Sequence, residues 1–176
     1  MVITPYKQTL SHSCLVACFL MLYGEKFTES DEHELALNGS KRIYPFYVVG
    51  IATEFVRKFD CKITIYADNK HFTSILQKSF MRETRVSVAH KKITQVFIAE
   101  LLKRQSIICH IDDHALGDYS HASHFIVLEK TTEKFITILD PWSGDKKRIT
   151  MAKLEEAISD LKNQIKMCPL LFTLEE

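Results

Sequence analysis

The sequence lacks both a long apolar run and an excess of either charge. A membrane-spanning helix needs roughly 20 apolar residues in succession, whereas the apolar run at 14–23 has only the length of a buried helix. The 23 Lys and Arg residues balance 22 Asp and Glu residues, and the longest basic cluster is the Lys-Lys-Arg at 146–148. We therefore expect no membrane partner and no nucleic-acid partner, because neither an apolar span nor a basic surface is available.

The chain also lacks the segments that usually divide a sequence into parts. It has no internal repeats, no low-complexity segments and no linker rich in Gly, Ser or Pro, so we expect a single domain over 1–176. Residues 1–7 lack the basic and apolar regions of a signal peptide. The five cysteines are odd in number and are not spaced as a disulfide framework. Free thiols fit a reducing compartment, so we expect a cytoplasmic protein, and export through a signal of another kind stays open.

The hydrophobic pattern predicts helices first and strands later, joined by short turns. Helices are expected at 14–23, 30–37, 48–59, 72–80, 93–103 and 151–162, and strands at 62–66, 85–88, 106–111, 124–129, 134–140 and 170–174. The helix at 93–103 is expected to carry Val96 on its apolar stripe. The order of the elements predicts an α+β fold with a mostly antiparallel sheet.

Cys14 lies where a polar segment, QTLSHS, meets the apolar run. Ser13 is a candidate N-cap and Gly24 a candidate stop, so the run should form a helix that is buried on all sides. At the first turn of that helix, the free N–H groups and the positive end of the dipole favour a thiolate, which is the nucleophilic form. The alternative is that Cys14 is only a small core residue, and Cys18, one turn later, fits that alternative better.

A hairpin in the last third supplies the groups that would activate such a thiol. His124 begins one predicted strand, Asp140 ends the next, and the turn between them contains Thr132. A turn centred on Thr132 places His124 directly opposite Asp140, with the two side chains within hydrogen-bond reach. A two-residue loop would shift this register by one. The amide of Gln8, with the backbone N–H of Cys14, could bind the oxyanion of a tetrahedral intermediate.

Three motifs resemble those of the papain-like cysteine peptidases, and they follow one another along the chain in the same order as in that family: QTLSHSC, SHFIVLE and TILDPW. Within that family the chain most resembles the compact bacteriocin-processing branch, whose members cut leader peptides after a double glycine. The resemblance implies a papain-like fold, in which a helical N-terminal half packs its nucleophile helix on a mostly antiparallel sheet. It implies that Cys14 is the nucleophile, His124 the general base and acid, Asp140 the residue that orients the imidazole, and Gln8 the oxyanion donor.

The resemblance also implies a peptide or protein substrate and no cofactor or metal. Two features depart from that branch. Leu15 stands where a glycine often follows the cysteine, and a bulky side chain there is expected to narrow the cleft or to alter substrate choice. The best-known members are fused to membrane transporters, whereas this chain has no membrane segment, so leader-peptide cleavage is not carried over.

Other interpretations of the same residues stay open. The triad could serve an acyltransferase, and the fold could be a non-catalytic peptide-binding module, for which Leu15 is the main support. A zinc site could use the histidines at 110, 114, 121 and 124 or the pair Cys14 and Cys18, although no Cys-x-x-Cys motif is present. His121 is the nearest competitor of His124 for the role of base.

Overall fold

A computed structural model describes residues 3–24, 27–41, 46–117 and 120–175. Among them are six α-helices and one seven-stranded sheet. The elements are α1 (Cys14–Tyr23), α2 (Glu29–Ser40), α3 (Phe46–Phe59), β1 (Lys62–Ala67), α4 (Lys70–Ser79), β2 (Val86–His90), α5 (Gln95–Leu102), β3 (Ile107–Asp112), the short 3₁₀ helix η1 (Asp113–Leu116), β4 (Ser123–Thr131), β5 (Phe135–Asp140), β6 (Asp145–Thr150), α6 (Met151–Asn163) and β7 (Leu170–Glu175).

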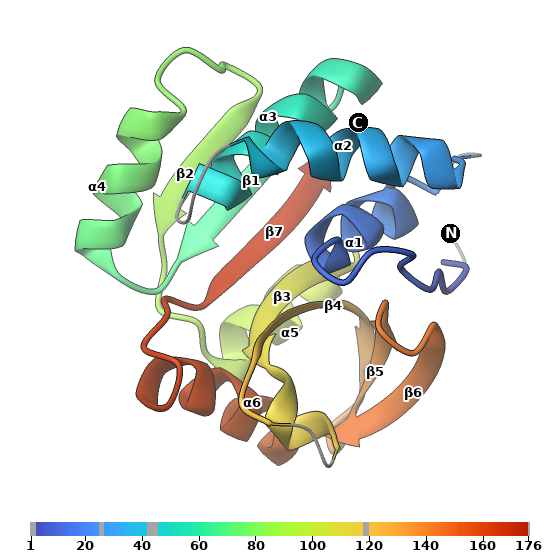
Figure 1. The fold of residues 1–176 in the computed structure, drawn as a ribbon. Helices are drawn as coiled ribbons and strands as arrows, with labels where there is room; N and C mark the ends of the chain where they lie inside the picture. The colour runs from blue at the N-terminus through green and yellow to red at the C-terminus, as the bar shows by residue number, and fades with distance from the viewer. Residues whose placement is uncertain (1–2, 25–26, 42–45, 118–119, 176) are drawn as a thin grey trace.

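The sheet has the order β2-β1-β7-β3-β4-β5-β6, which Figure 1 shows as one twisted layer. Strands β1 and β2 pair in parallel, and the other neighbouring strands pair antiparallel. The prediction of an α+β fold with a mostly antiparallel sheet is therefore confirmed.

Helices cover both faces of the sheet, and each face has its own hydrophobic cluster. Adjacent residues of β3 point into different clusters, because side chains alternate along a strand: Ile108 packs in the cluster of α1 and α3, and Cys109 in that of α5 and α6. In the first cluster, the rings of Phe19 and Phe55 stack with 4.8 Å between their centroids. Helix α1 packs against both β3 and β4 (Figure 1).

Helix α1 follows the prediction closely. Its residues from Leu15 to Met21 are all buried, and Gly24 ends the helix in the left-handed conformation with φ of 73°. The predicted cap is wrong in one respect. Ser13 precedes the helix, but its hydroxyl makes no capping hydrogen bond and donates instead to the carbonyl of Leu10 and to Glu32.

Two further elements differ from the prediction. Strand β6 was not expected, because its sequence DKKRIT has no alternation of apolar residues and only Ile149 is buried. It is an edge strand, and charged side chains are usual at a sheet edge. In α5, Thr94 is the N-cap and Val96 is 70% exposed, so Val96 does not belong to the buried stripe.

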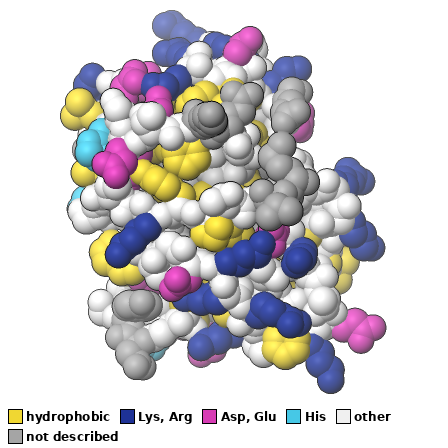
Figure 2. Space-filling model, turned by 90° about the vertical axis from the view of Figure 1, so that its right-hand side faces the viewer, with side chains coloured by type: hydrophobic (Ala, Val, Ile, Leu, Met, Phe, Trp, Pro, Cys, Tyr) yellow, Lys and Arg dark blue, Asp and Glu magenta, His cyan; other side chains and the backbone are white. Residues whose placement is uncertain are grey.

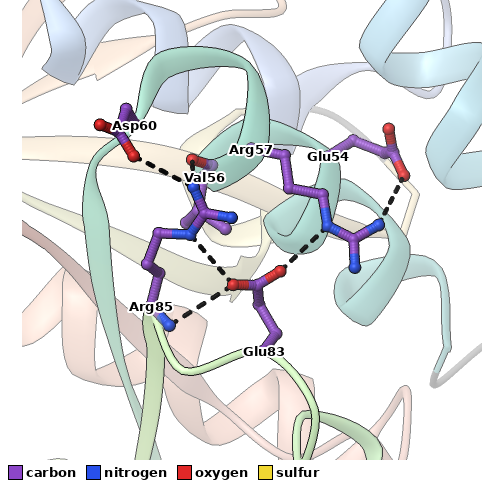
Figure 3. A network of polar contacts seen from close by, with 6 residues as sticks. All are labelled: Glu54, Val56, Arg57, Asp60, Glu83 and Arg85. Atoms are coloured by element: carbon purple, nitrogen blue, oxygen red, sulfur yellow. Dashed lines mark hydrogen bonds and ion pairs between the residues drawn. The ribbon is translucent and has the colours of Figure 1, made fainter.

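A network of charged side chains joins the end of α3 to the segment before β2 (Figure 3). The carboxylate of Glu83 accepts hydrogen bonds from Arg57 Nε at 3.0 Å and from Arg85 Nε at 3.1 Å. Burial raises the pKa of Glu83, but the two guanidinium groups lower it by more than burial raises it. The carboxyl group therefore stays ionised at neutral pH. The network lies at the end of α3 opposite to Tyr47, which belongs to the cavity described below.

The molecular surface is mixed in character on the face drawn in Figure 2. Lys and Arg side chains are spread over this face, and Asp, Glu and hydrophobic side chains lie between them. Of the helices that the structure describes, none has both the length and the apolar character that crossing a bilayer requires.

Candidate active site

A cavity of about 700 Å³ lies between the start of α1 and the start of β4. Cys14, the first residue of α1, lines it together with His124, the second residue of β4. Its other lining residues include Tyr47, His110, Asp113 and Trp142. The structure therefore brings the predicted nucleophile and the predicted base to one cavity, although they are far apart in the sequence.

Helix α1 is held against β4 one turn after Cys14. The thiol of Cys18 donates to the carbonyl of Phe125 at 3.3 Å, and both residues are buried. Because Phe125 directly follows His124, this contact places the first turn of α1 beside the imidazole. Burial raises the pKa of Cys18 well above its ordinary value, so Cys18 is a neutral core thiol, as predicted.

The predicted contact between His124 and Asp140 is present, with 2.9 Å between Nε2 and Oδ1. The register that leads to it is not the predicted one. Strands β4 and β5 pair Val127 with Leu139, and a bulge between Leu128 and Lys130 shifts the pairing toward the turn. Extended to the open end of the hairpin, this register places Asp140 opposite residue 126. His124 and Asp140 are thus diagonal neighbours, which long side chains can still join.

The Asp140 carboxylate is held from several sides. Its Oδ1 accepts the backbone N–H of Trp142 at 3.0 Å, and its Oδ2 accepts Lys147 Nζ at 3.2 Å. Burial raises the pKa of Asp140, but His124 and then Lys147 lower it to well below the usual range of a carboxyl group. Lys147 comes from β6, the strand that the sequence pattern did not reveal, so this second cation was not foreseen.

The protonated form of His124 is favoured by its partners. Burial lowers the pKa of His124, but the hydrogen bond with Asp140 and the interactions with Cys14 raise it to about 9. Since a carboxylate only accepts, Nε2–H donates to Asp140, which leaves Nδ1 for the Cys14 sulfur. The imidazole is 6% exposed, so both of these interactions act in a poorly solvated place.

The turn after Asp140 also holds the segment that carries Gln8. The backbone N–H of Gln8 donates to the carbonyl of Pro141 at 2.8 Å. Gly144 has φ of 75°, and a Cβ at this position would come within 2.8 Å of the Cβ of Lys7. The close contact requires a glycine, so the turn and the N-terminal segment are packed as one unit.

The side chain of Gln8 is not among the residues that line this cavity. Its Nε2 donates to the carbonyl of Leu10 at 2.7 Å, and its buried Oε1 has no hydrogen-bond partner among the described residues. An amide nitrogen carries two N–H groups, so one remains after the bond to Leu10. Gln8 is thus fixed near the start of α1, but its predicted role is not visible in this arrangement.

A buried carboxylate that the sequence did not suggest organises the segment before Cys14. Glu32 of α2 is fully buried and accepts from the backbone N–H of Thr9 at 2.9 Å and from the hydroxyl of Tyr6 at 2.6 Å. The hydroxyl of Ser13 donates to the same carboxylate. In the sequence, Glu32 belongs to the acidic stretch ESDE, which is typical of a solvated helix face, so no local signal could have revealed its role.

Leu15 does not narrow the cavity, contrary to the expectation from the sequence. Its side chain is fully buried in the cluster between α1 and the sheet, and it is not among the residues that line the cavity. A bulky residue at this position therefore leaves access to Cys14 unchanged. The main support for a non-catalytic binding module is lost with it.

The four histidines considered as zinc ligands do not form one group in the described part of the chain, although the rings of His114 and His121 lie 4.2 Å apart between centroids. His110 stacks on Phe125, and its two ring nitrogens contact the Cys168 carbonyl and the Ser123 hydroxyl. Burial lowers the pKa of His110 to about 3, so it is a neutral part of the cavity wall. In the described part of the chain, the group whose ligand atoms could surround a metal is Asp112, His121 and Asp160, which the sequence analysis did not identify.

His121 has a different partner from His124. Its Nδ1 lies 2.6 Å from Oδ2 of the buried Asp112, and the ring is partly exposed. Ser120 and Ala122 on either side of it line the cavity, but His121 itself does not. The two neighbours of His121 therefore belong to the cavity wall, whereas the His121 side chain contacts Asp112 instead.

The chain matches no model of a known protein family and no curated protein. What it can do must therefore follow from the site itself. A thiol at a helix start, a buried imidazole and a buried carboxylate form one chain of interactions that ends in an open cavity. Such an arrangement can generate a thiolate and can deliver a proton to a leaving group.

Proposed function

We propose that this protein is a cysteine hydrolase of the papain-like type that cleaves a peptide or amide bond. The observation that carries the proposal is the set of interactions of His124 at the cavity. Its Nε2 lies 2.9 Å from Asp140 Oδ1, and its other ring nitrogen is left for the sulfur of Cys14. The chain order of these residues, with a nucleophile helix packed on a mostly antiparallel sheet, fits the same family.

The first half of the reaction forms an acyl-enzyme. The Cys14 thiolate adds to the carbonyl carbon of the substrate, and a C–S bond forms while the carbonyl π bond becomes an oxyanion. The His124 imidazolium then gives its Nδ1 proton to the leaving nitrogen as the C–N bond breaks. The products are an amine and a thioester on Cys14.

The second half returns the enzyme to its starting state. Neutral His124 takes a proton from water, which adds to the thioester carbonyl, and the thiolate leaves as a carboxylic acid is released. Asp140 stays ionised, because Lys147 stabilises its charge and the imidazolium does so as well whenever His124 is protonated. Its part is to fix the imidazole and to favour the imidazolium.

The oxyanion needs donors at the start of α1. The N–H groups of the first helical turn have no intrahelical acceptor, so the backbone N–H of Cys14 can serve. The second N–H of Gln8 can join it after rotation of the amide, which is anchored at Leu10 in the present arrangement. We retain Gln8 as the proposed second donor.

The test is a screen of peptides that carry an electrophilic carbon in place of the scissile carbonyl, followed by mass spectrometry of the modified residue. We expect labelling of Cys14 and none in Cys14→Ser. Cys168 is the matched internal control, because it is the other partly exposed thiol but has no imidazole partner among the described residues. Preferential labelling of Cys168, or equal labelling of both thiols, would remove Cys14 from the mechanism.

A further inference from the structure

The cavity contains a carboxylate that the proposed mechanism does not use. Asp113, the first residue of η1, lines the cavity together with Cys14 and His124. Its side chain is partly buried, and its Oδ1 is buried without a hydrogen-bond partner in the described part of the chain. A buried acceptor left in this state costs free energy, which a ligand with a suitable donor would recover.

The charges around Asp113 indicate what kind of donor is missing. The other two carboxylates close to it have side-chain partners: Asp140 contacts His124 and Lys147, and Asp112 contacts His121. No ion pair joins Asp113 to a Lys or Arg side chain of the described residues, so this carboxyl group of the cavity wall has no cation of its own. Burial raises the pKa of Asp113, and the charge of His124 opposes this rise.

The cavity that Asp113 lines has apolar and aromatic side chains in its wall, besides serines and histidines. Tyr47, Val48, Phe125 and Trp142 line the same cavity. A long alkyl chain that ends in a cation would suit such a site, because its methylene groups cover apolar surface while its charged end reaches the carboxylate. Charge-assisted hydrogen bonds of this kind are stronger than bonds between neutral groups.

We infer that Asp113 is a specificity residue that binds an ammonium group of the substrate, next to the bond that Cys14 attacks. The inference rests on the proposed function only in taking the ligand to be a peptide. The ammonium group could belong to a lysine side chain or to the amino terminus of the peptide. The two sources share the same chemistry and must be separated by experiment.

The experiment measures binding without turnover. Trp142 is the only tryptophan of the chain and lines the cavity, so its fluorescence reports ligand entry. In Cys14→Ser, we would titrate acetylated tetra-alanine amides in which lysine, or norleucine as its uncharged analogue, replaces each alanine in turn. Tetra-alanine amide with a free amino terminus forms the second arm, with its acetylated form as the control.

We expect one lysine probe, or the free-amine probe, to bind at least about tenfold more tightly than its uncharged counterpart. Adding Asp113→Asn should reduce this preference to less than about twofold. Asp145→Asn, which removes an exposed charge outside the cavity, should leave the preference intact. Thermal melting would verify that the variants are folded.

Two results would overturn the inference. The first is equal binding of charged and uncharged probes at every position. This result needs only the Cys14→Ser variant, so it refutes the inference whether or not the Asp113 variant folds. A preference that survives in Asp113→Asn refutes it as well, since another group must then bind the cation. Neither result touches the proposed hydrolase, which fails instead if the electrophilic peptides do not label Cys14.

Discussion

Replacing Asp140 tests how far this carboxylate controls the charge of His124. The pKa of His124 is raised from 6.5 to about 9 although the ring is buried. A difference of about 2.5 units corresponds to roughly 3 kcal/mol in favour of the imidazolium. Asp140 is the first of the groups that raise the pKa, and Cys14 is the second, so removal of Asp140 should cancel a substantial share.

We expect the pKa of His124 to fall by about one unit or more in Asp140→Asn, and further in Asp140→Ala. Asparagine keeps an oxygen that can accept from Nε2–H, but it has no charge to stabilise the imidazolium. Alanine removes both the charge and the anchor, and burial then favours the neutral ring. If the proposed hydrolysis is correct, turnover should decrease in the order wild type, Asp140→Asn, Asp140→Ala.

The measurement is an NMR titration of the His124 Cε1–H signal, identified by its loss in His124→Gln. It requires no substrate and so is independent of the proposed reaction. Asp145→Asn, which changes the exposed first residue of β6, is the control and should leave the titration unchanged. An unaltered pKa in Asp140→Ala would refute the reasoning, and wild-type turnover in that variant would reduce the triad to a Cys–His dyad.

Four other variants test the site and its supports. His124→Ala should abolish turnover, whereas His121→Ala should retain most of it, because His124 lines the cavity and His121 does not. The reverse order of activities in a peptide-cleavage assay would assign the role of base to His121. Glu32→Ala should lower the free energy of unfolding by roughly 3 kcal/mol and slow the alkylation of Cys14 by iodoacetamide, because it removes the acceptor of the buried Ser13 hydroxyl and of the donors of Tyr6 and Thr9. Urea unfolding measures the change in stability, and an unchanged unfolding free energy or an unchanged alkylation rate would contradict this prediction. Glu83→Gln should cost about 1–2 kcal/mol in the same unfolding assay but leave alkylation unchanged, since its network lies at the other end of α3.

The pH dependence of stability follows from the same imidazole. Because folding raises the pKa of His124, its protonation stabilises the folded state fully below about pH 6.5, and this contribution disappears as the pH rises through about 9. We expect the unfolding free energy of the wild type to decrease over this interval by more than that of His124→Gln. Parallel curves for the two proteins would contradict the assignment.

Local sequence determined the elements that depend on local physics. The apolar run after Cys14 could only be a buried helix, and Gly24 ends it because a residue without Cβ enters the left-handed conformation at little cost. The strands of the last third were visible from β-branched and alternating residues. The proximity of His124 and Asp140 was also predictable, because a short turn joins their strands, and a shift of two residues along a strand keeps side chains on the same face.

Only the tertiary structure decided the features that depend on distant residues. The turn is centred between Glu133 and Lys134 instead of on Thr132, since Thr131 pairs with Ile136, and the bulge after Leu128 then sets the pairing at the open end of the hairpin. Strand β6 has no apolar alternation, because an edge strand buries little, yet it supplies Lys147 to Asp140. The side chain of Leu15 points into the core because of the packing of α1 on the sheet.

Burial of charge is the clearest limit of the sequence. Glu32 and Asp113 look like ordinary surface acids, since their neighbours in the sequence are polar. Their environments come from segments that only folding brings near, the N-terminal segment for Glu32 and the start of α1 for Asp113. A carboxylate becomes a structural or binding group through the donors and the solvent around it, and neither is encoded in its immediate sequence.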